Sequence, residues 1–196
     1  GSYVFTPMRY IWDQYPHYFG RSRGLKKWLI RRAATRLRTW DAASAARVDH
    51  FVADSEFVAQ RIRKYYRRDA AVIHPPVDTD FFSPGSGEKE GHFLAVTALV
   101  PYKRVDLLVD VFNRTGDSLV IVGGGPEKRA LQGRARKNIR FEQNLSPEAL
   151  RERYRRARAF VHAGLEDFGI AFVESLACGT PVLASSRGGV ADIVTH

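Results

Sequence analysis

Glu166 and Glu174 are two carboxylates separated by seven residues, and an apolar run interrupted by Gly169 lies between them. A helix predicted for residues 171–177 begins just after that glycine, which lets the backbone approach a ligand closely. Amides at a helix entrance have no partner within the helix and lie at the positive end of its dipole, so they can donate to ligand oxygens. These amides belong to Phe168, Gly169 and Ile170. The stretch predicts a ligand site, although a solvated loop acid and a surface helix acid would have the same spacing.

The elements that must position this stretch are short apolar strands alternating with helices. Strands are predicted at residues 93–97, 118–122, 139–142, 159–162 and 182–184. Helices are predicted at residues 105–113, 127–135, 147–157 and 171–177. This alternation requires parallel crossovers, so it predicts an α/β fold with a Rossmann-type parallel sheet between two helical layers. Ligands of such sheets bind beyond the carboxyl ends of the strands.

The earlier part of the chain predicts a second, smaller group of elements. Strands are expected near residues 3–6, 48–53 and 71–73, with helices over 25–46 and from the N-cap Ser55 to Tyr66. An aromatic loop over residues 7–20 could either line a sugar site or cover a core. Residues 82–91 are Ser, Pro, Gly, Glu and Lys in large part, which is typical of a flexible linker. We therefore expect two domains, residues 1–84 and 85–196.

The composition is that of an ordinary globular protein, with 44% hydrophobic residues in a chain of 196. No apolar run approaches the roughly 20 residues that cross a bilayer, and the start has no signal-peptide pattern. The single cysteine, Cys178, excludes an internal disulfide and is expected to be a buried packing residue. Together these features predict a cytoplasmic protein.

Positive charge is concentrated in the first part of the chain. Residues 1–75 hold 15 Lys and Arg against 6 Asp and Glu, a net charge of +9, whereas residues 76–196 have a net charge of +1. Residues 21–38 combine eight cations with Leu25, Trp28 and Leu29 at helical spacing. Such a helix could bind anionic lipid peripherally at the inner membrane face, or bury its apolar stripe in the core beneath a solvated basic face. Nucleic acid is the weakest candidate partner, because no recognised binding motif accompanies the charge.

Several motifs in order along the chain resemble one enzyme family. They are Phe-Gly-Ile at 168–170, Ala-Cys-Gly-Thr-Pro at 177–181, Pro-Tyr-Lys-Arg at 101–104, Gly-Gly-Gly-Pro at 123–126 and Thr-Pro-Met-Arg-Tyr-Ile-Trp-Asp at 6–13. The set is similar to the retaining GT-B glycosyltransferases of group 1, family 4. The segment 6–13 most resembles the mannosyltransferase-like branch that builds bacterial surface polysaccharides. The resemblance implies a GT-B-like fold with a partial N-terminal acceptor-side domain and a C-terminal donor domain.

The resemblance also implies a reaction, in which a sugar moves with retention from a nucleotide sugar, such as a GDP- or UDP-sugar, to a polysaccharide or lipid-linked acceptor. Lys103 would stabilise the leaving diphosphate, with Arg104 the weaker candidate, and Glu166 would hold the transferred sugar together with the amides of Phe168, Gly169 and Ile170. Glu174 would bind the ribose hydroxyls. The remaining candidates are Gly123 and Gly124 for close backbone approach, Asn144 and Leu145 for the nucleobase edge, and Arg9, Tyr10 and Trp12 on the acceptor side. No metal and no cofactor are implied.

The chain departs from the family pattern at two positions. Ala98 stands where most relatives carry an arginine that pairs with the motif lysine, and Phe5 stands where a histidine serves the acceptor side. A second interpretation is therefore a weakly active or inactive fragment that acts as a nucleotide-sugar-binding or partner-binding module. The chain is also shorter at both ends than the family pattern, so we expect exposed sheet edges that favour self-association or a partner chain.

Overall fold

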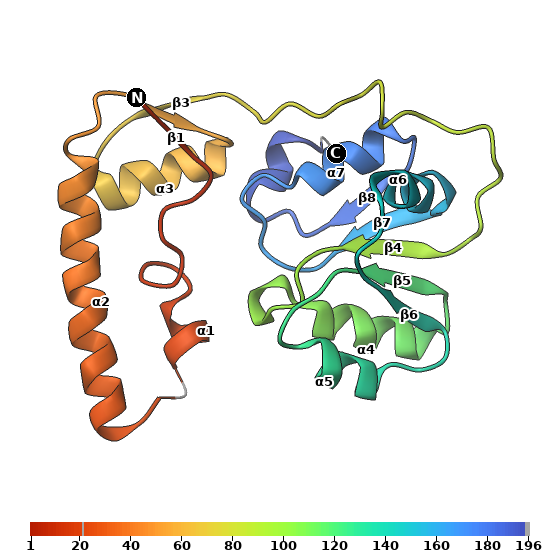
Figure 1. Cartoon of the computed structure of the whole chain (residues 1–196), viewed down its shortest axis with the longest axis horizontal. Coiled ribbons are helices and arrows are strands. Elements are labelled where there is room, and N and C mark those ends of the chain that lie inside the picture. The colour runs from red at the N-terminus through yellow and green to blue at the C-terminus, as the bar shows by residue number, and fades with distance from the viewer. Residues whose placement is uncertain (21, 195–196) are drawn as a thin grey trace. The chain divides into compact units, whose positions relative to one another are not determined.

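The computed structural model describes residues 1–20 and 22–194, and the chain divides into two compact units, Gly1–Pro75 and Pro76–His196. Each unit is a sheet with its own helices (Figure 1). The division falls nine residues before the boundary expected after residue 84.

The second unit is built on a five-stranded parallel sheet in the order β6-β5-β4-β7-β8. Its strands are β4 (Phe93–Val96), β5 (Leu119–Val122), β6 (Ile139–Glu142), β7 (Ala159–His162) and β8 (Val182–Ala184). Its helices are α4 (Val105–Thr115), α5 (Lys128–Arg134), α6 (Pro147–Arg156) and α7 (Ile170–Ala177), with short 3-10 turns at Pro101–Lys103 and Gly189–Asp192. Every predicted strand and helix of this unit lies within two residues of its observed bounds.

Two hydrophobic clusters cover the two faces of this sheet. One joins α4 and α5 to the side chains of Ala95, Leu119 and Ile121. The other joins α6 and α7 to Leu94, Val120 and Phe160. Alternate residues of β4 and β5 therefore enter opposite layers, as the two-residue period of a strand requires. In Figure 1, α4 and α5 lie on one side of the sheet and α6 and α7 on the other.

Residues 81–83, which follow the division between the units, pack against α6 of the second unit. The Arg151 guanidinium lies 4.5 Å from the centre of the Phe81 ring, and Arg155 Nε donates to the Ser83 carbonyl at 2.7 Å. The Phe82 ring packs edge-on against Tyr154, with 6.0 Å between the ring centres. The start of the predicted flexible linker is thus packed against α6, and the division between units comes earlier than composition indicates.

The first unit has a three-stranded parallel sheet in the order β1-β2-β3, formed by Ser2–Val4, Phe51–Ala53 and Ala70–Val72. Its helices are α1 (Tyr15–Phe19), α2 (Gly24–Ala45) and α3 (Glu56–Tyr66). Ser55 caps α3 as predicted, since its hydroxyl accepts from the Val58 amide at 3.2 Å. Helix α1 was not predicted and lies within the expected aromatic loop.

Helix α2 meets the core of its unit through small residues. Only Ala34, Asp41 and Ala45 of this helix are buried. Leu25 and Trp28, members of the predicted apolar stripe, are exposed. The interpretation in which this stripe fills the core is therefore wrong. Arg21, the first cation of the predicted basic segment, lies outside the described residues. No helix within residues 1–20 and 22–194 combines the length and apolar character needed to cross a bilayer.

Candidate functional site

The strand order of the second unit reverses between β4 and β7, because β5 and β6 continue on one side of β4 while β7 and β8 lie on the other. Crevices at such a switch point are where open α/β sheets bind ligands. The loop after β4 carries Lys103 and the loop after β7 carries Glu166. Lys103 Nζ and Glu166 Oε2 form an ion pair, and the Lys103 side chain is buried. The structure thus joins two residues that are 63 positions apart and were both predicted for the site.

Gly164 allows the two loops to approach each other. A Cβ atom built on Gly164 would lie 2.5 Å from both Cα and the carbonyl oxygen of Lys103. The Leu165 amide also donates to the Tyr102 carbonyl at 3.4 Å. Only a glycine fits this contact without a shift of backbone, so the residue at 164 determines where Lys103 lies.

His162, the last residue of β7, is a third titratable group beside this pair. Its Nε2 lies 3.7 Å from Glu166 Oε2, and its ring packs edge-on against Phe172 with 5.3 Å between centres. Burial lowers the pKa of the imidazole to about 4, while the Glu166 charge opposes this shift and the Lys103 charge adds to it. His162 is therefore neutral at neutral pH.

Glu174 is held by a buried tyrosine. The hydroxyl of Tyr154, on α6, donates to Glu174 Oε2 at 2.7 Å, and Tyr154 is fully buried. Burial and the Glu174 charge raise the pKa of the phenol, so it stays protonated and remains a donor. Glu174 Oε1 has no hydrogen-bond partner among residues 1–20 and 22–194, which leaves it available to a ligand.

The entrance of α7 has the predicted glycine. Gly169 is the N-cap, with φ of 100°, and no side chain of the described residues caps the helix. A Cβ at this position would lie 2.5 Å from the Phe172 ring and 3.1 Å from Glu166 Cγ. Phe168 is buried, whereas Ile170 is exposed. The geometry places the helix entrance directly beside the Glu166 side chain.

The glycine turn after β5 packs against the loop after β4. The Leu99 amide donates to the Gly124 carbonyl at 2.8 Å. A Cβ on Gly123 would lie 2.0 Å from the Thr97 carbonyl oxygen, so the backbones are in direct contact. These contacts bring Gly123 and Gly124 to the same sheet edge as Lys103.

Asn144 and Leu145 follow β6 at the same edge. Asn144 has a left-handed backbone with φ of 58° and is exposed. Leu145 packs against the cluster that contains Tyr154 and Phe172. Ser146 then caps α6 by accepting from the Ala149 amide at 3.2 Å.

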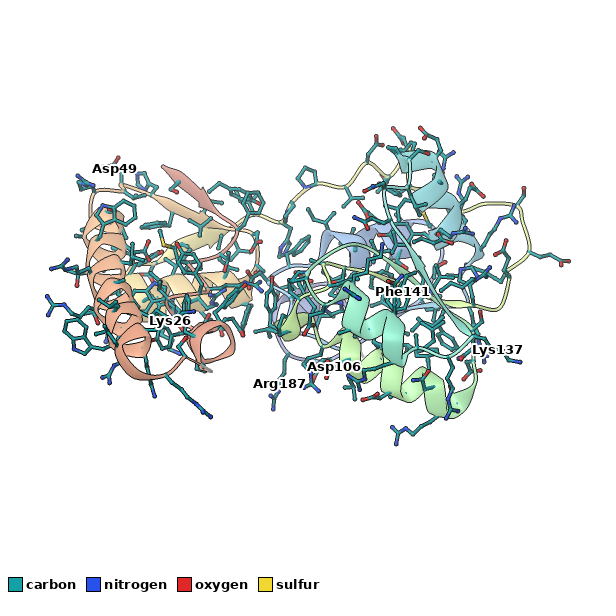
Figure 2. All side chains as sticks on the ribbon, turned by 60° about the horizontal axis from the view of Figure 1, so that its bottom comes forward. Lys26, Asp49, Asp106, Lys137, Phe141 and Arg187 are labelled. Atoms are coloured by element: carbon teal, nitrogen blue, oxygen red, sulfur yellow. The ribbon has the colours of Figure 1, made fainter. Side chains whose placement is uncertain are left out.

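Arg104 takes a different partner from Lys103. Its Nε donates to Asp106 Oδ1 at 3.1 Å at the start of α4, and the Arg104 side chain is half exposed. Figure 2 labels Asp106. The structure does not bring Arg104 into the Lys103 and Glu166 pair. Ala98, where the family pattern has an arginine, is exposed in the same loop.

The acceptor-side candidates belong to the first unit. Trp12 Nε1 donates to Asp41 Oδ2 at 2.8 Å, and its ring stacks on Tyr65 with 4.6 Å between centres. The Tyr10 hydroxyl contacts the Met8 sulfur at 3.3 Å, and Arg9 Nε lies 3.4 Å from the Thr6 hydroxyl. Trp12 therefore has a structural contact that the motif did not reveal. Phe5 is exposed and packs edge-on against Tyr3.

The sequence motifs and the strand-edge geometry agree with one family. The family model described as "Glycosyl transferases group 1" matches residues 76–196, which is more than half of the chain and covers the whole site of the second unit. The chain belongs to the group 1 glycosyl transferases. The predicted membership of group 1 is therefore confirmed.

Curated relatives of this group 1 glycosyl transferase include a D-inositol 3-phosphate glycosyltransferase of Mycobacterium sp. (strain KMS), 29% identical over 167 residues, with 72% of this chain and 38% of the relative covered. A GDP-mannose-dependent alpha-(1-6)-phosphatidylinositol monomannoside mannosyltransferase of Mycolicibacterium smegmatis is 31% identical over 172 residues, with 71% of this chain and 45% of the relative covered. The chain thus spans less than half the length of these two relatives.

The fold is shared with solved glycosyltransferase structures. Anabaena HepE, in complex with UDP and glucose, superimposes with a TM-score of 0.73 at 18% identity, with 81% of this chain and 50% of that chain covered. The predicted α/β, GT-B-like fold class is confirmed by this likeness and by the parallel sheets.

Two residues of the site in this group 1 glycosyl transferase were not predicted, His162 and Tyr154. A histidine that ends a buried apolar strand four residues before Glu166 is a signal for the first. For Tyr154 the sequence has no comparable signal, because its contact with Glu174 depends on how α6 packs against α7.

Proposed function

We propose that the carboxyl edge of the second sheet binds a nucleotide sugar and that this glycosyl transferase moves the sugar to a glycan or lipid-linked acceptor with retention. The observation that carries the proposal is the Lys103 and Glu166 ion pair at the switch point of the sheet. A buried cation beside a carboxylate offers a charge for phosphate and an acceptor for sugar hydroxyls within one site.

Lys103 is proposed to bind the diphosphate of the donor. The charge of Lys103 is compensated by Glu166, so a diphosphate must compete with that carboxylate for the ammonium group. Once Lys103 turns to phosphate, Glu166 is released to accept from hydroxyls of the sugar. Charge that develops on the leaving diphosphate is then stabilised by a positioned cation, which contributes to catalysis because it is oriented in advance.

Glu174 is proposed to bind the ribose of the donor. Tyr154 fixes one carboxylate oxygen, and the other accepts from a ribose hydroxyl. The glycine turn at Gly123 and Gly124 lets the backbone approach the donor, and Asn144 and Leu145 border the base. The amides of Phe168, Gly169 and Ile170 donate to oxygens of the sugar or phosphate at the entrance of α7.

The relatives' names support the choice of donor class. One relative is GDP-mannose-dependent, and HepE was crystallised with UDP and glucose. A GDP- or UDP-sugar is therefore the proposed donor, and the site is proposed to need neither a metal nor a cofactor. Arg9, Tyr10 and Trp12 remain the proposed acceptor-side residues, and a cytoplasmic location, self-association and a partner chain remain predictions.

Isothermal titration of the 196-residue chain with UDP, GDP and GDP-mannose tests the donor site. We expect micromolar binding of one nucleotide, lost in Glu174→Ala and kept in Glu88→Gln, a control that removes an exposed carboxylate of the linker. No binding of any of the three would contradict the proposal. Turnover of the bound sugar nucleotide with retained anomeric configuration, measured by NMR, tests the chemistry. Binding without turnover on glycan or lipid-linked acceptors would favour the nucleotide-sugar-binding module.

A further inference from the structure

Helix α2 presents an apolar stripe to the outside of its unit. Its buried residues, Ala34, Asp41 and Ala45, recur at intervals of seven and four residues and so lie on one side of the helix. The large side chains lie elsewhere. Their exposed fractions are 72% for Leu25, 54% for Trp28, 53% for Leu29 and 57% for Trp40. Exposed aromatic and aliphatic side chains in such number along one helix indicate an interaction surface.

The exposed charge of α2 is entirely positive. The helix has six Lys and Arg residues and one acid, Asp41. That acid is buried and accepts hydrogen bonds from Trp12 and Tyr66, so it does not offset the exposed cations. The exposed cations without an ion-pair partner in the described part of the chain are Lys26, Lys27, Arg31, Arg32 and Arg36. Lys27 lies seven residues before Ala34 and so projects from the same side of the helix as the buried residues. We call the other four cations, together with Leu25, Trp28, Leu29 and Trp40, the α2 face.

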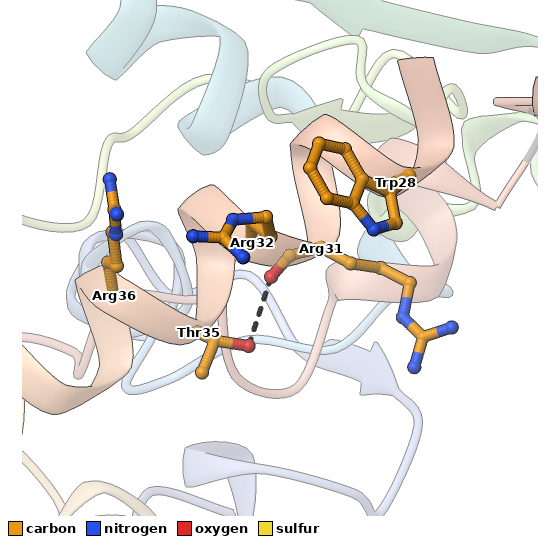
Figure 3. Close-up of a pocket in the computed structure, with 5 residues that line it drawn as sticks. All are labelled: Trp28, Arg31, Arg32, Thr35 and Arg36. Carbon is orange, nitrogen blue, oxygen red and sulfur yellow. Dashed lines mark hydrogen bonds between the residues drawn. The ribbon is translucent and has the colours of Figure 1, made fainter. Parts of the chain in front are cut away.

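The cations of the α2 face do not converge on a point. Trp28, Arg31, Arg32, Thr35 and Arg36 border a shallow hollow of about 490 Å³. Figure 3 shows the Arg31 guanidinium pointing away from those of Arg32 and Arg36. The Thr35 hydroxyl is bonded to the Arg31 carbonyl at 3.0 Å, and the Arg32 guanidinium lies 5.3 Å from the centre of the Trp28 ring. Divergent cations suit an extended array of negative charges better than a single bound anion.

We propose that the α2 face docks on the surface of a bilayer that contains anionic phospholipid. Charge complementarity selects this partner, since lysines and arginines close to an anionic leaflet are attracted to it. The interleaved Trp and Leu side chains select a bilayer over other polyanions, because they can enter the boundary between headgroups and acyl chains. A 22-residue helix is about 33 Å long and can lie in the plane of the interface. This inference goes beyond the proposed transferase activity and does not depend on it.

Co-sedimentation of the 196-residue chain with vesicles tests the proposal. We expect binding to phosphatidylcholine vesicles with about 30 mol% phosphatidylglycerol, at least about tenfold weaker binding in high salt, and little binding to phosphatidylcholine alone. Emission of Trp28 and Trp40 should shift to the blue on binding. Equal binding to both vesicle types would overturn the proposal.

Two variants separate this face from general positive charge. Arg31→Gln/Arg32→Gln/Arg36→Gln should weaken vesicle binding by about tenfold or more. Its matched control is Arg114→Gln/Arg129→Gln/Lys137→Gln, which removes the same charge from exposed residues of the second unit, Lys137 among them (Figure 2). We expect the control to change binding by less than about twofold. Equal losses in both variants would show non-specific attraction and overturn the proposal.

A third variant, Leu25→Ser/Leu29→Ser, tests the apolar stripe without changing charge. Both side chains are exposed, so the fold should be kept, which circular dichroism checks. Vesicle binding should fall about tenfold, since two apolar side chains no longer leave water. Unchanged vesicle binding would overturn the proposal, as would DNA binding with the same dependence on these leucines. Sedimentation velocity without lipid is the last check. If the wild type is a dimer and this variant is a monomer, the α2 face is a contact between copies of the chain, and the proposal is overturned.

Discussion

The Tyr154 hydroxyl donates a 2.7 Å hydrogen bond to Glu174, and this bond links α6 to α7. Because Tyr154 is fully buried, its position is determined by packing and not by solvent. The carboxylate that we propose binds the ribose is therefore oriented before any ligand arrives. A polar group held in this way loses less conformational freedom on binding.

Tyr154→Phe should weaken both folding and nucleotide binding. Removing a buried hydrogen bond to a carboxylate costs about 1–2 kcal/mol of unfolding free energy, which urea denaturation measures. Nucleotide affinity should fall several-fold in titration calorimetry, because Glu174 is no longer oriented. The control is Tyr3→Phe, which removes a hydroxyl bonded to the Ile73 carbonyl in the first unit and should leave nucleotide affinity unchanged. Equal affinities for wild type and Tyr154→Phe would mean that Glu174 needs no such support.

Lys103→Gln should reduce turnover far more than Arg104→Gln. The first removes the buried cation at the switch point, and losing one preorganised charge typically costs 100-fold or more in rate, about 2.7 kcal/mol of the barrier. The second removes an exposed cation that is paired with Asp106, and turnover should stay within about threefold. Initial rates with a common donor and acceptor compare them. A larger loss in Arg104→Gln would transfer the phosphate role to that residue.

Much of the second unit could be predicted because its local signals agree. The bounds of β6, β7 and β8 match the predicted residues, since β7 and β8 are short, mainly apolar runs and β6 alternates Ile139 and Phe141 with charged residues. The meeting of Lys103 and Glu166 follows from the rule that parallel strands end at one edge. The direct ion pair between them does not, because it depends on the close contact at Gly164.

The apolar pattern of a helix does not always show which of its sides meets the core. In α2 the periodic apolar stripe predicts a face, but the contact is made by Ala34, Asp41 and Ala45, which give little hydrophobic signal. Asp41 is buried because Trp12 and Tyr66 donate to it from elsewhere in the unit. Such pairings arise only from tertiary packing, as do the contacts of Arg151 and Arg155 that hold residues 81–83 to α6.

Gly164→Ala should destabilise the second unit and displace Lys103. The added methyl would lie 2.5 Å from Lys103 Cα, so backbone must move, and overpacking of this kind costs about 1–3 kcal/mol. Gly133→Ala is the matched control, because Gly133 lies in α5 with no atom within 4 Å of the added methyl. It should be neutral or stabilising by up to about 1 kcal/mol, since alanine is the better helix former. Urea denaturation ranks the two, and the prediction fails if they are equal.

His162 should make the folded chain less stable in acid. An unfolded histidine has a pKa near 6.5, whereas burial lowers the pKa of His162 to about 4. Between these values the unfolded chain binds more protons, so the unfolding free energy falls as the pH decreases from 6.5 to 4, by on the order of 3 kcal/mol from this group. Above pH 6.5 the contribution is fully present.

The measurement is urea denaturation at several pH values in wild type and His162→Gln. The variant lacks this titration, so its stability should fall less between pH 6.5 and 4, whatever its absolute stability. Burial also lowers the pKa of His92, and because that residue is common to both chains its contribution cancels in the difference. His50→Gln removes an exposed histidine and should keep the wild-type profile. Parallel profiles for wild type and His162→Gln would show that folding does not lower the pKa of His162. The prediction would then be wrong.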